Sequence, residues 1–169
     1  MSTPNVQNLK DQNAAYAQGF THGHLELPPA KKYLVVTCMD ARIDPAAAFG
    51  ISLGDAHVVR NAGGSARDAL RSIIISQQLL GTREIILVKH TGCGMLTFAN
   101  NHAHGLVADR LGPTAAAEIA SLDFLPFTSL DHAVHDDIDF LKKQSAVPTH
   151  VDISGWVYDV ETGKARQLV

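Results

Sequence analysis

Two short apolar stretches of the sequence end in side chains that bind transition metals. Cys38 follows the run 33–37, and His90 and Cys93 follow the run 84–89. Thiolate sulfur and imidazole nitrogen match zinc in softness and in tetrahedral preference. Three protein ligands leave the fourth position open, as in catalytic zinc sites. We therefore predict a Zn2+ site formed by Cys38, His90 and Cys93, the alternative being two buried thiols and a hydrogen-bonded histidine.

A carboxylate and a guanidinium lie beside the first of these ligands, in the pattern Cys38-x-Asp40-x-Arg42. A bidentate pair between Asp40 and Arg42 would keep the carboxylate ionised, oriented and off the metal. Asp40 would then accept the proton of a zinc-bound hydroxide. Two alternatives stay open: Asp40 acts as an exchangeable fourth ligand that closes the site, or the pair is an ordinary surface ion pair worth little energy.

A glycine pair precedes the clearest predicted helix. Gly63 and Gly64 follow the strand predicted over 56–60, and Ser65 with Asp68 has the spacing of a capping box. Backbone N–H groups at such a helix N-terminus can bind an anion, so we predict that Gly63 and Gly64 contact the substrate. The equal alternative is that they only form a tight turn.

Predicted strands alternate with predicted helices along the chain. We expect strands at 33–37, 56–60, 84–89 and 151–160, and helices at 5–18, 45–50, 65–81 and 131–143, with weakly helical sequence from 95 to 112. This order predicts an α/β fold: a single domain with a central, mostly parallel sheet flanked by helices and an antiparallel strand at the C-terminal edge. Sites in such sheets lie beyond the carboxyl ends of the strands, where Cys38 and His90 both stand.

Composition narrows the functional class. The chain has 169 residues, a formal net charge of −3 and 46% hydrophobic residues. This length suits one domain over residues 1–169. The charge gives no basic footprint for nucleic acid, and no apolar run reaches the roughly 20 residues that cross a bilayer. Without a secretory pattern at the N-terminus, we expect a cytoplasmic protein that acts on a small molecule.

Three segments resemble the signature stretches of the β-class carbonic anhydrases. They are 38–42 (Cys-Met-Asp-Ala-Arg), 60–64 (Arg-Asn-Ala-Gly-Gly) and 90–94 (His-Thr-Gly-Cys-Gly), and the segment 155–163 is also typical of that family. The chain is most similar to a compact branch that also includes carbonyl sulfide and carbon disulfide hydrolases. The resemblance implies zinc on the three predicted ligands and the Asp40–Arg42 dyad. It also implies a homodimer or dimer of dimers with sites at the interface, in which the arm 1–28 packs on the partner subunit.

The predicted reaction is zinc-dependent addition of metal-bound hydroxide to a linear molecule with an electrophilic carbon. Hydration of CO2 to bicarbonate is the first hypothesis. Hydrolysis of carbonyl sulfide to CO2 and H2S at the same zinc is a close alternative, and a catalytically silent zinc scaffold or sensor is a more distant one. The presence of both Asp40 and Arg42 argues against the silent module, because a structural zinc site needs neither.

Overall fold

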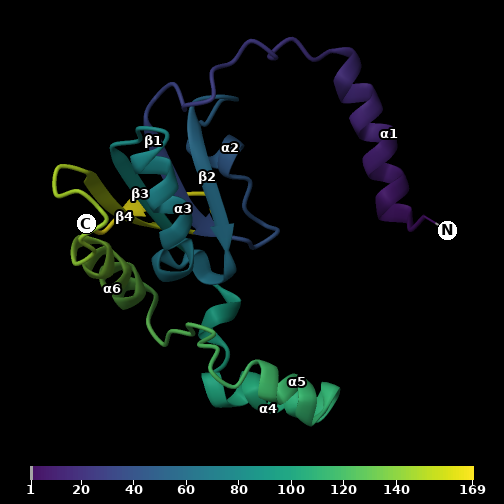
Figure 1. The fold of residues 1–169 in the computed structure, drawn as a ribbon, viewed down its shortest axis with the longest axis vertical. Helices are drawn as coiled ribbons and strands as arrows, with labels where there is room; N and C mark the ends of the chain where they lie inside the picture. The colour runs from purple at the N-terminus through teal and green to yellow at the C-terminus, as the bar shows by residue number, and fades with distance from the viewer. Residues whose placement is uncertain (1) are drawn as a thin grey trace.

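The computed structural model describes residues 2–169 and contains one five-stranded sheet in the order β2-β1-β3-β4-β5. Its strands are β1 (Tyr33–Cys38), β2 (Ala56–Asn61), β3 (Glu84–His90), β4 (Asp152–Tyr158) and β5 (Ala165–Gln167). The first four strands run parallel, and β5 pairs antiparallel with β4. The predicted α/β class, the mostly parallel sheet and the antiparallel C-terminal edge strand are therefore confirmed (Figure 1).

Most of the α-helices begin at a residue whose side chain caps the first turn. They are α1 (Pro4–Gln18), α2 (Pro45–Phe49), α3 (Ala66–Gln78), α4 (Asn100–Leu111), α5 (Pro113–Glu118) and α6 (Leu130–Lys142), with 3-10 turns η1 (Ala62–Gly64) and η2 (Gly94–Leu96). Asp44 caps α2 and the Ser65 hydroxyl caps α3 by accepting from the Asp68 amide, as predicted. The helix expected over 65–81 is shorter, because α3 ends at Gln78 and Leu79 is its C-cap.

The hydrophobic core lies between the sheet and the helices α3 and α6, which pack against each other and against the strands. In β1 every residue after Tyr33 is buried, as expected for an inner strand of a parallel sheet. A Cβ added at Gly155 of β4 would lie 2.5 Å from Val134 of α6, so the absence of a side chain there permits the close helix–sheet contact. This packing holds the carboxyl ends of β1 and β3 at one edge of the core.

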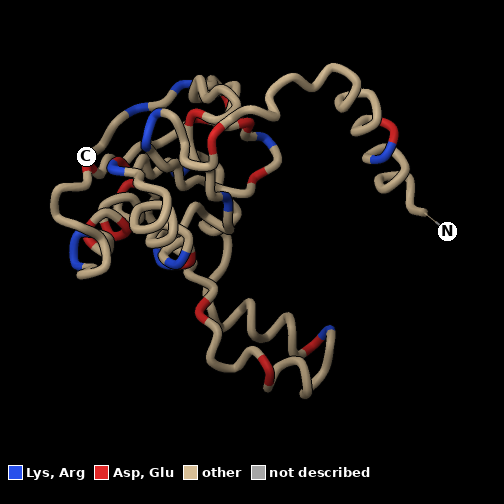
Figure 2. Tube along the Cα trace, turned by 45° about the horizontal axis from the view of Figure 1, so that its top comes forward, with Lys and Arg blue, Asp and Glu red and all other residues tan. Residues whose placement is uncertain are grey.

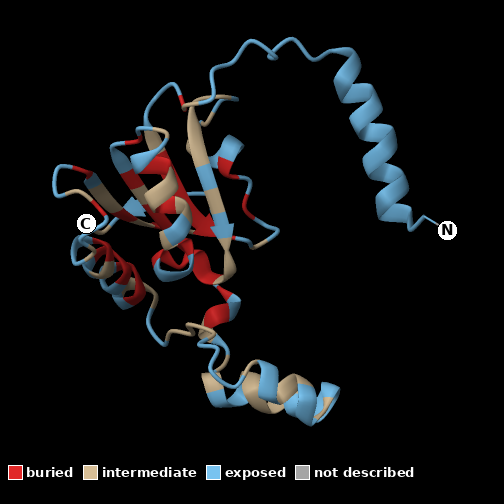
Figure 3. Ribbon diagram, in the orientation of Figure 1, coloured by how far each residue is buried: buried red, intermediate tan, exposed pale blue. Residues whose placement is uncertain are grey.

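Two helical segments project from this core (Figures 1 and 3). Helix α1 buries none of its residues, and α4 and α5 form a hairpin that also buries none. Figure 2 shows basic and acidic residues interspersed over the body, and α1 contains only Lys10 and Asp11 as charged residues. The helix predicted over 5–18 therefore forms, but it finds no packing surface within its own chain.

None of the helices within the described residues 2–169 is long and apolar enough to cross a membrane. The boundaries predicted for the single domain and for the arm 1–28 stay predictions, and Met1 lies outside the described residues.

Candidate metal centre

The three predicted metal ligands meet at the carboxyl ends of two neighbouring strands. Cys38 is the last residue of β1 and His90 the last residue of β3, and β1 pairs directly with β3. Cys93 comes from the turn that follows β3. The two sulfur atoms and one imidazole nitrogen all lie within 4.8 Å of one another, and all three residues are buried. One ion can therefore contact all three side chains.

The imidazole of His90 is arranged as a metal ligand. Its Nδ1 lies 2.9 Å from the carbonyl oxygen of Thr91, and because a carbonyl can only accept, Nδ1 must carry the proton. Nε2 is then the atom left with a free lone pair. It is buried and has no hydrogen-bond partner in the structure. An unpartnered buried nitrogen facing two thiols is the arrangement that a bound cation completes.

The two thiols are electrostatically coupled. The neighbouring Cys93 thiol, the His90 side chain and the backbone N–H groups of Asp40 and Gly63 hold the pKa of the Cys38 thiol well below its usual value. The Cys38 contact, with burial, raises the pKa of Cys93 in return. Burial lowers the pKa of His90, but the contacts with Cys38, Thr91 and Asp40 together outweigh it and raise the pKa overall. Cys38 is thus the thiol that ionises first, and a divalent cation would stabilise both sulfurs as thiolates.

Asp40 and Arg42 form the bidentate pair that the sequence predicts. Arg42 Nε and Nη2 donate to Asp40 Oδ1 and Oδ2 at 2.9 and 2.7 Å, and the Arg42 backbone N–H also donates to Oδ1 at 2.9 Å. Arg42 Nη2 further donates to the carbonyl oxygen of Gly92, which ties the dyad to the turn that carries Cys93. The hydrogen bonds from Arg42 lower the pKa of the Asp40 carboxyl. The carboxylate therefore stays ionised beside the centre.

The Asp40 carboxylate faces the predicted ligands without joining them. Its Oδ2 atom lies 3.7 Å from His90 Nε2. The Asp40 side chain keeps 17% of its exposure, whereas the His90 side chain keeps 1%. Asp40 thus lies between solvent and the buried donor atoms, within reach of a molecule bound at the open position.

The turn that contains Gly63 and Gly64 lies against the end of β1. Both glycines have positive φ angles, of 74° and 58°. A Cβ at Gly64 would lie 3.0 Å from the carbonyl carbon of Thr37 and 3.1 Å from the backbone nitrogen of Cys38. Only glycine permits this approach without strain. The structure thus brings the predicted glycine turn against the backbone of the predicted ligand Cys38.

Three further residues support the centre and were not assigned a role from the sequence. Arg60 of β2 donates from Nε to the carbonyl oxygen of Cys38 at 3.0 Å and from Nη2 to that of Asp40 at 2.7 Å. Lys89 of β3 and Asp137 of α6 form a buried ion pair beneath the glycine turn. A lysine directly after the apolar run 85–88, in a strand expected to be mostly buried, was the sequence signal for that pair.

Apolar side chains surround the ligand set. Cys38 and Cys93 pack with Ile43 and Met95 in a buried cluster that is separate from the main core. Partly buried aromatic residues, including Phe127 and Tyr158, cover this cluster. Such a lining excludes water and strengthens the electrostatic interactions of the charged groups inside it.

This chain combines an α/β sheet, a Cys-His-Cys centre at the carboxyl ends of its strands and an Asp–Arg pair beside that centre. The combination defines a class of zinc proteins. The family model described as carbonic anhydrase matches residues 33–165 of this chain. The chain belongs to the carbonic anhydrase family, in its β class.

Individual relatives agree with this assignment. The chain is 43% identical over 162 residues to "Beta-carbonic anhydrase 1" of Mycobacterium tuberculosis, covering 92% of this chain and 93% of the relative. It superimposes on a carbonic anhydrase from Glaciozyma antarctica with a TM-score of 0.95 and 46% identity, covering 99% and 100% of the two chains. It is also 35% identical over 162 residues to a carbon disulfide hydrolase of Saccharolobus solfataricus, covering 83% and 79%. The relatives of this chain thus include both carbonic anhydrases and carbon disulfide hydrolases.

Proposed function

We propose that this protein is a zinc-dependent β-carbonic anhydrase that converts CO2 and water to bicarbonate and a proton. The observation that carries the proposal is the position of Asp40 Oδ2, 3.7 Å from His90 Nε2. It places an ionised carboxylate beside a Cys2His donor set typical of zinc. The ligand residues are Cys38, His90 and Cys93.

Zinc bound at this site would supply a Lewis acid that lowers the pKa of water from about 16 towards 7. The residues of the chain then determine how that water is used. Asp40 Oδ2 can accept a hydrogen bond from the attacking water and so aim its lone pair at the carbon of CO2. Arg42 keeps both Asp40 oxygens fixed and ionised. In the alternative arrangement, Asp40 would serve as an exchangeable fourth ligand and would block the substrate.

The glycine turn supports the proposal in a different way from the sequence prediction. We predicted that both Gly63 and Gly64 bind the substrate anion. The turn lies against the backbone of Cys38, a predicted ligand, and the Gly63 N–H helps to lower the pKa of the Cys38 thiol. Substrate binding by the two glycines stays a prediction, and stabilising the Cys38 thiolate is a second role that the turn can fill.

Carbonyl sulfide hydrolysis is the second candidate, and the carbon disulfide hydrolases among the relatives favour keeping it. The same geometry serves both substrates, because each presents one electrophilic carbon in a linear molecule. Stopped-flow measurement of CO2 hydration, beside an assay of H2S release from carbonyl sulfide and carbon disulfide, separates them. The proposal expects CO2 turnover that a chelator abolishes. H2S release without CO2 hydration would replace it with the second candidate, and zinc without either activity would indicate the silent scaffold.

We further propose that the protein forms a homodimer, alone or as a dimer of dimers, in which α1 packs on the partner subunit. Helix α1 exposes Val6, Leu9 and Tyr16 by 46%, 67% and 58%, and touches none of the core. Isolated helices of this length are marginal in water, so an unpacked α1 with these exposed apolar side chains needs a partner surface. The two free thiols must stay reduced to bind metal, which supports a cytoplasmic location.

A further inference from the structure

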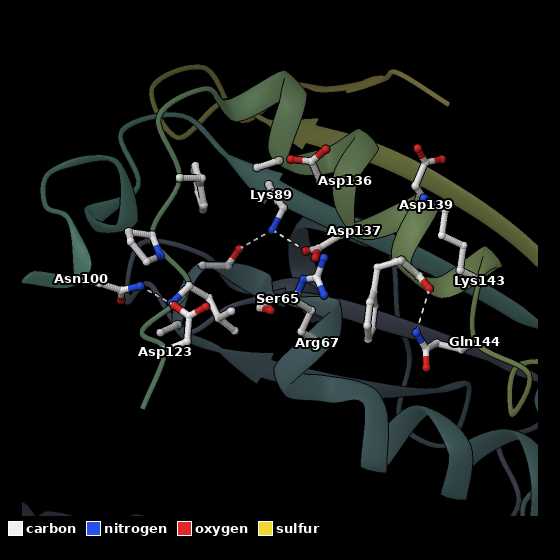
Figure 4. Close-up of a pocket in the computed structure, with 17 residues that line it drawn as sticks. Ser65, Arg67, Lys89, Asn100, Asp123, Asp136, Asp137, Asp139, Lys143 and Gln144 are labelled. Carbon is white, nitrogen blue, oxygen red and sulfur yellow. Dashed lines mark hydrogen bonds and ion pairs between the residues drawn. The ribbon is translucent and has the colours of Figure 1, made fainter. Parts of the chain in front are cut away.

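A buried ion pair connects helix α6 to the glycine turn beside the metal centre. Lys89 Nζ lies 2.8 Å from Asp137 Oδ2, and the two side chains are only 3% and 9% exposed. Both residues line a cavity of about 710 Å3 between α6, α3 and the segment 123–127 (Figure 4). A charged pair this deep costs desolvation energy and is weak evidence for stability by itself. Its contacts indicate a more specific role.

The Lys89 ammonium group donates to a carboxylate and to the glycine turn. Besides the Asp137 carboxylate, Nζ donates to the carbonyl oxygens of Gly63 and Gly64 at 3.0 and 3.2 Å. An ammonium group has three N–H bonds, so these three acceptors satisfy it. The ring of Phe127, 5.1 Å from Nζ, faces the same ammonium group. Lys89 therefore holds the two glycine carbonyls on the side of the turn away from the metal centre.

Asp137 fixes the other end of the same segment. Its Oδ2 atom accepts from the backbone N–H of Ala66, the first residue of α3, at 3.1 Å. The segment 63–66 is thus held at its first two carbonyls by Lys89 and at its last amide by Asp137. Because residue 89 directly precedes the ligand His90 in β3, this clamp belongs to the same strand end that carries the metal centre.

We propose that Lys89 and Asp137 are positioning residues that hold the Gly63–Gly64 turn against the backbone of Thr37 and Cys38, and that the Gly63 N–H held there donates a hydrogen bond to the Cys38 sulfur. A hydrogen bond to a thiolate ligand withdraws charge from the sulfur and tunes the metal that it binds. The expected loss of catalysis rests on the proposed function. The expected change at the metal–sulfur bond does not, because it is independent of the substrate.

The decisive variant carries Lys89→Met and Asp137→Asn together, because changing one residue alone would leave a buried charge unpaired. The asparagine side chain keeps an oxygen that can accept from the Ala66 amide. In the cobalt-substituted protein, we expect the sulfur-to-cobalt charge-transfer band to move to longer wavelength. In the zinc protein, we expect kcat for CO2 hydration to fall by about 10- to 100-fold, the range typical of outer-sphere partners.

The matched control is Val147→Ala, which opens a cavity in the main core at the opposite end of the sheet, before β4 begins. It should lower the melting temperature while leaving the cobalt spectrum and kcat unchanged. The same spectral shift in Val147→Ala, or an unchanged spectrum in the double variant, would overturn the inference. If the wild-type enzyme hydrates no CO2, the proposed function fails, yet the cobalt spectrum still tests the positioning role.

A measurement on the wild-type protein covers the case in which the double variant does not fold. Loaded with a spin-active cadmium isotope, the protein should show scalar coupling in NMR between the metal and the Gly63 amide proton, transmitted through the N–H···S hydrogen bond and the Cys38 sulfur. The Asp40 amide, which also helps to lower the pKa of the Cys38 thiol, serves as the internal reference. Coupling at Asp40 without coupling at Gly63 would show that the turn does not reach the ligand and would overturn the inference.

Discussion

Asp40 Oδ2 lies 3.7 Å from His90 Nε2, and Arg42 holds the carboxylate in that position through hydrogen bonds to both of its oxygens. His90 Nε2, a buried nitrogen with no hydrogen-bond partner, thus lies beside an oriented, ionised carboxylate. A metal and a proton acceptor can therefore act on the same water molecule. Separate variants can test four parts of the protein: the predicted ligands, the Asp40–Arg42 pair, the Gly63–Gly64 turn and helix α1.

Replacing the ligand Cys38 with serine should remove zinc. A serine hydroxyl is a much weaker ligand than a thiolate, and we expect metal affinity to fall by more than the roughly 100-fold that outer-sphere changes reach. Metal analysis of the purified protein after dialysis checks this. The wild-type protein should also melt at a lower temperature after chelation, because a metal that binds only the folded state stabilises it. A Cys38→Ser protein with full zinc content would disprove the assigned ligand set.

Replacing Asp40 with asparagine should leave zinc bound but lower kcat/KM for CO2 by about 10²- to 10⁴-fold, the usual contribution of a positioned proton acceptor. Asparagine keeps the shape but loses the charge that Arg42 binds. The control is Asp55→Asn, which removes the carboxylate of another ion pair, that with Lys31 at 2.8 Å, before β2 begins. Equal activity in the two variants would remove the dyad from the mechanism.

Alanine at Gly64 should disturb the centre more than alanine at another glycine of similar backbone conformation. Gly64 and Gly81 have φ angles of 58° and 73°, so each substitution costs about 1–2 kcal/mol of backbone strain. Only the Cβ at Gly64 meets backbone, that of Thr37 and Cys38, whereas a Cβ at Gly81 meets nothing within 4 Å. We expect Gly64→Ala to have the lower melting temperature and the weaker zinc binding. Equal zinc affinity in the two variants would contradict the close contact with Cys38.

Charges placed on the exposed apolar side of α1 should dissociate the dimer. Leu9→Asp combined with Tyr16→Asp puts two carboxylates where we propose that the partner subunit packs. Sedimentation should then show a monomer with reduced activity. Leu79→Asp is the matched control, since Leu79 is 75% exposed at the end of α3 and has no proposed partner contact. A dimer that persists in the double variant would exclude the arm from the interface.

Asp159 should stabilise the folded protein at neutral pH but not in acid. Hydrogen bonds from the Glu161 amide, the Thr162 side chain and the Thr91 hydroxyl lower the pKa of Asp159. A lowered folded-state pKa stabilises the fold above the unfolded-state value of about 3.9, and that stability is lost as the pH falls through the folded-state pKa. The melting-temperature difference between wild type and Asp159→Asn should thus be present at neutral pH and shrink below about pH 4. A difference that is constant with pH would contradict it.

The order of elements was readable from the sequence because each carries its own local signal. Asp44-Pro45 and Ser65 mark helix starts, and the buried runs that end at Cys38 and His90 are typical of inner parallel strands. The segment 95–129 was less predictable. Its helices α4 and α5 bury no side chain within this chain, so no periodic apolar face records where they begin.

The sequence by itself determined the types of the predicted ligands, the Asp40–Arg42 pair and the strand ends that carry them, because these depend on residue identity and short spacing. The tertiary structure decided what depends on contacts between distant segments. Only the fold places Lys89 and Asp137, 48 positions apart, in one buried pair beneath Gly63 and Gly64. Only the fold brings the Gly63–Gly64 turn against Cys38. Arg60 reaches the carbonyl oxygens of Cys38 and Asp40 because β1 and β2 pair in register.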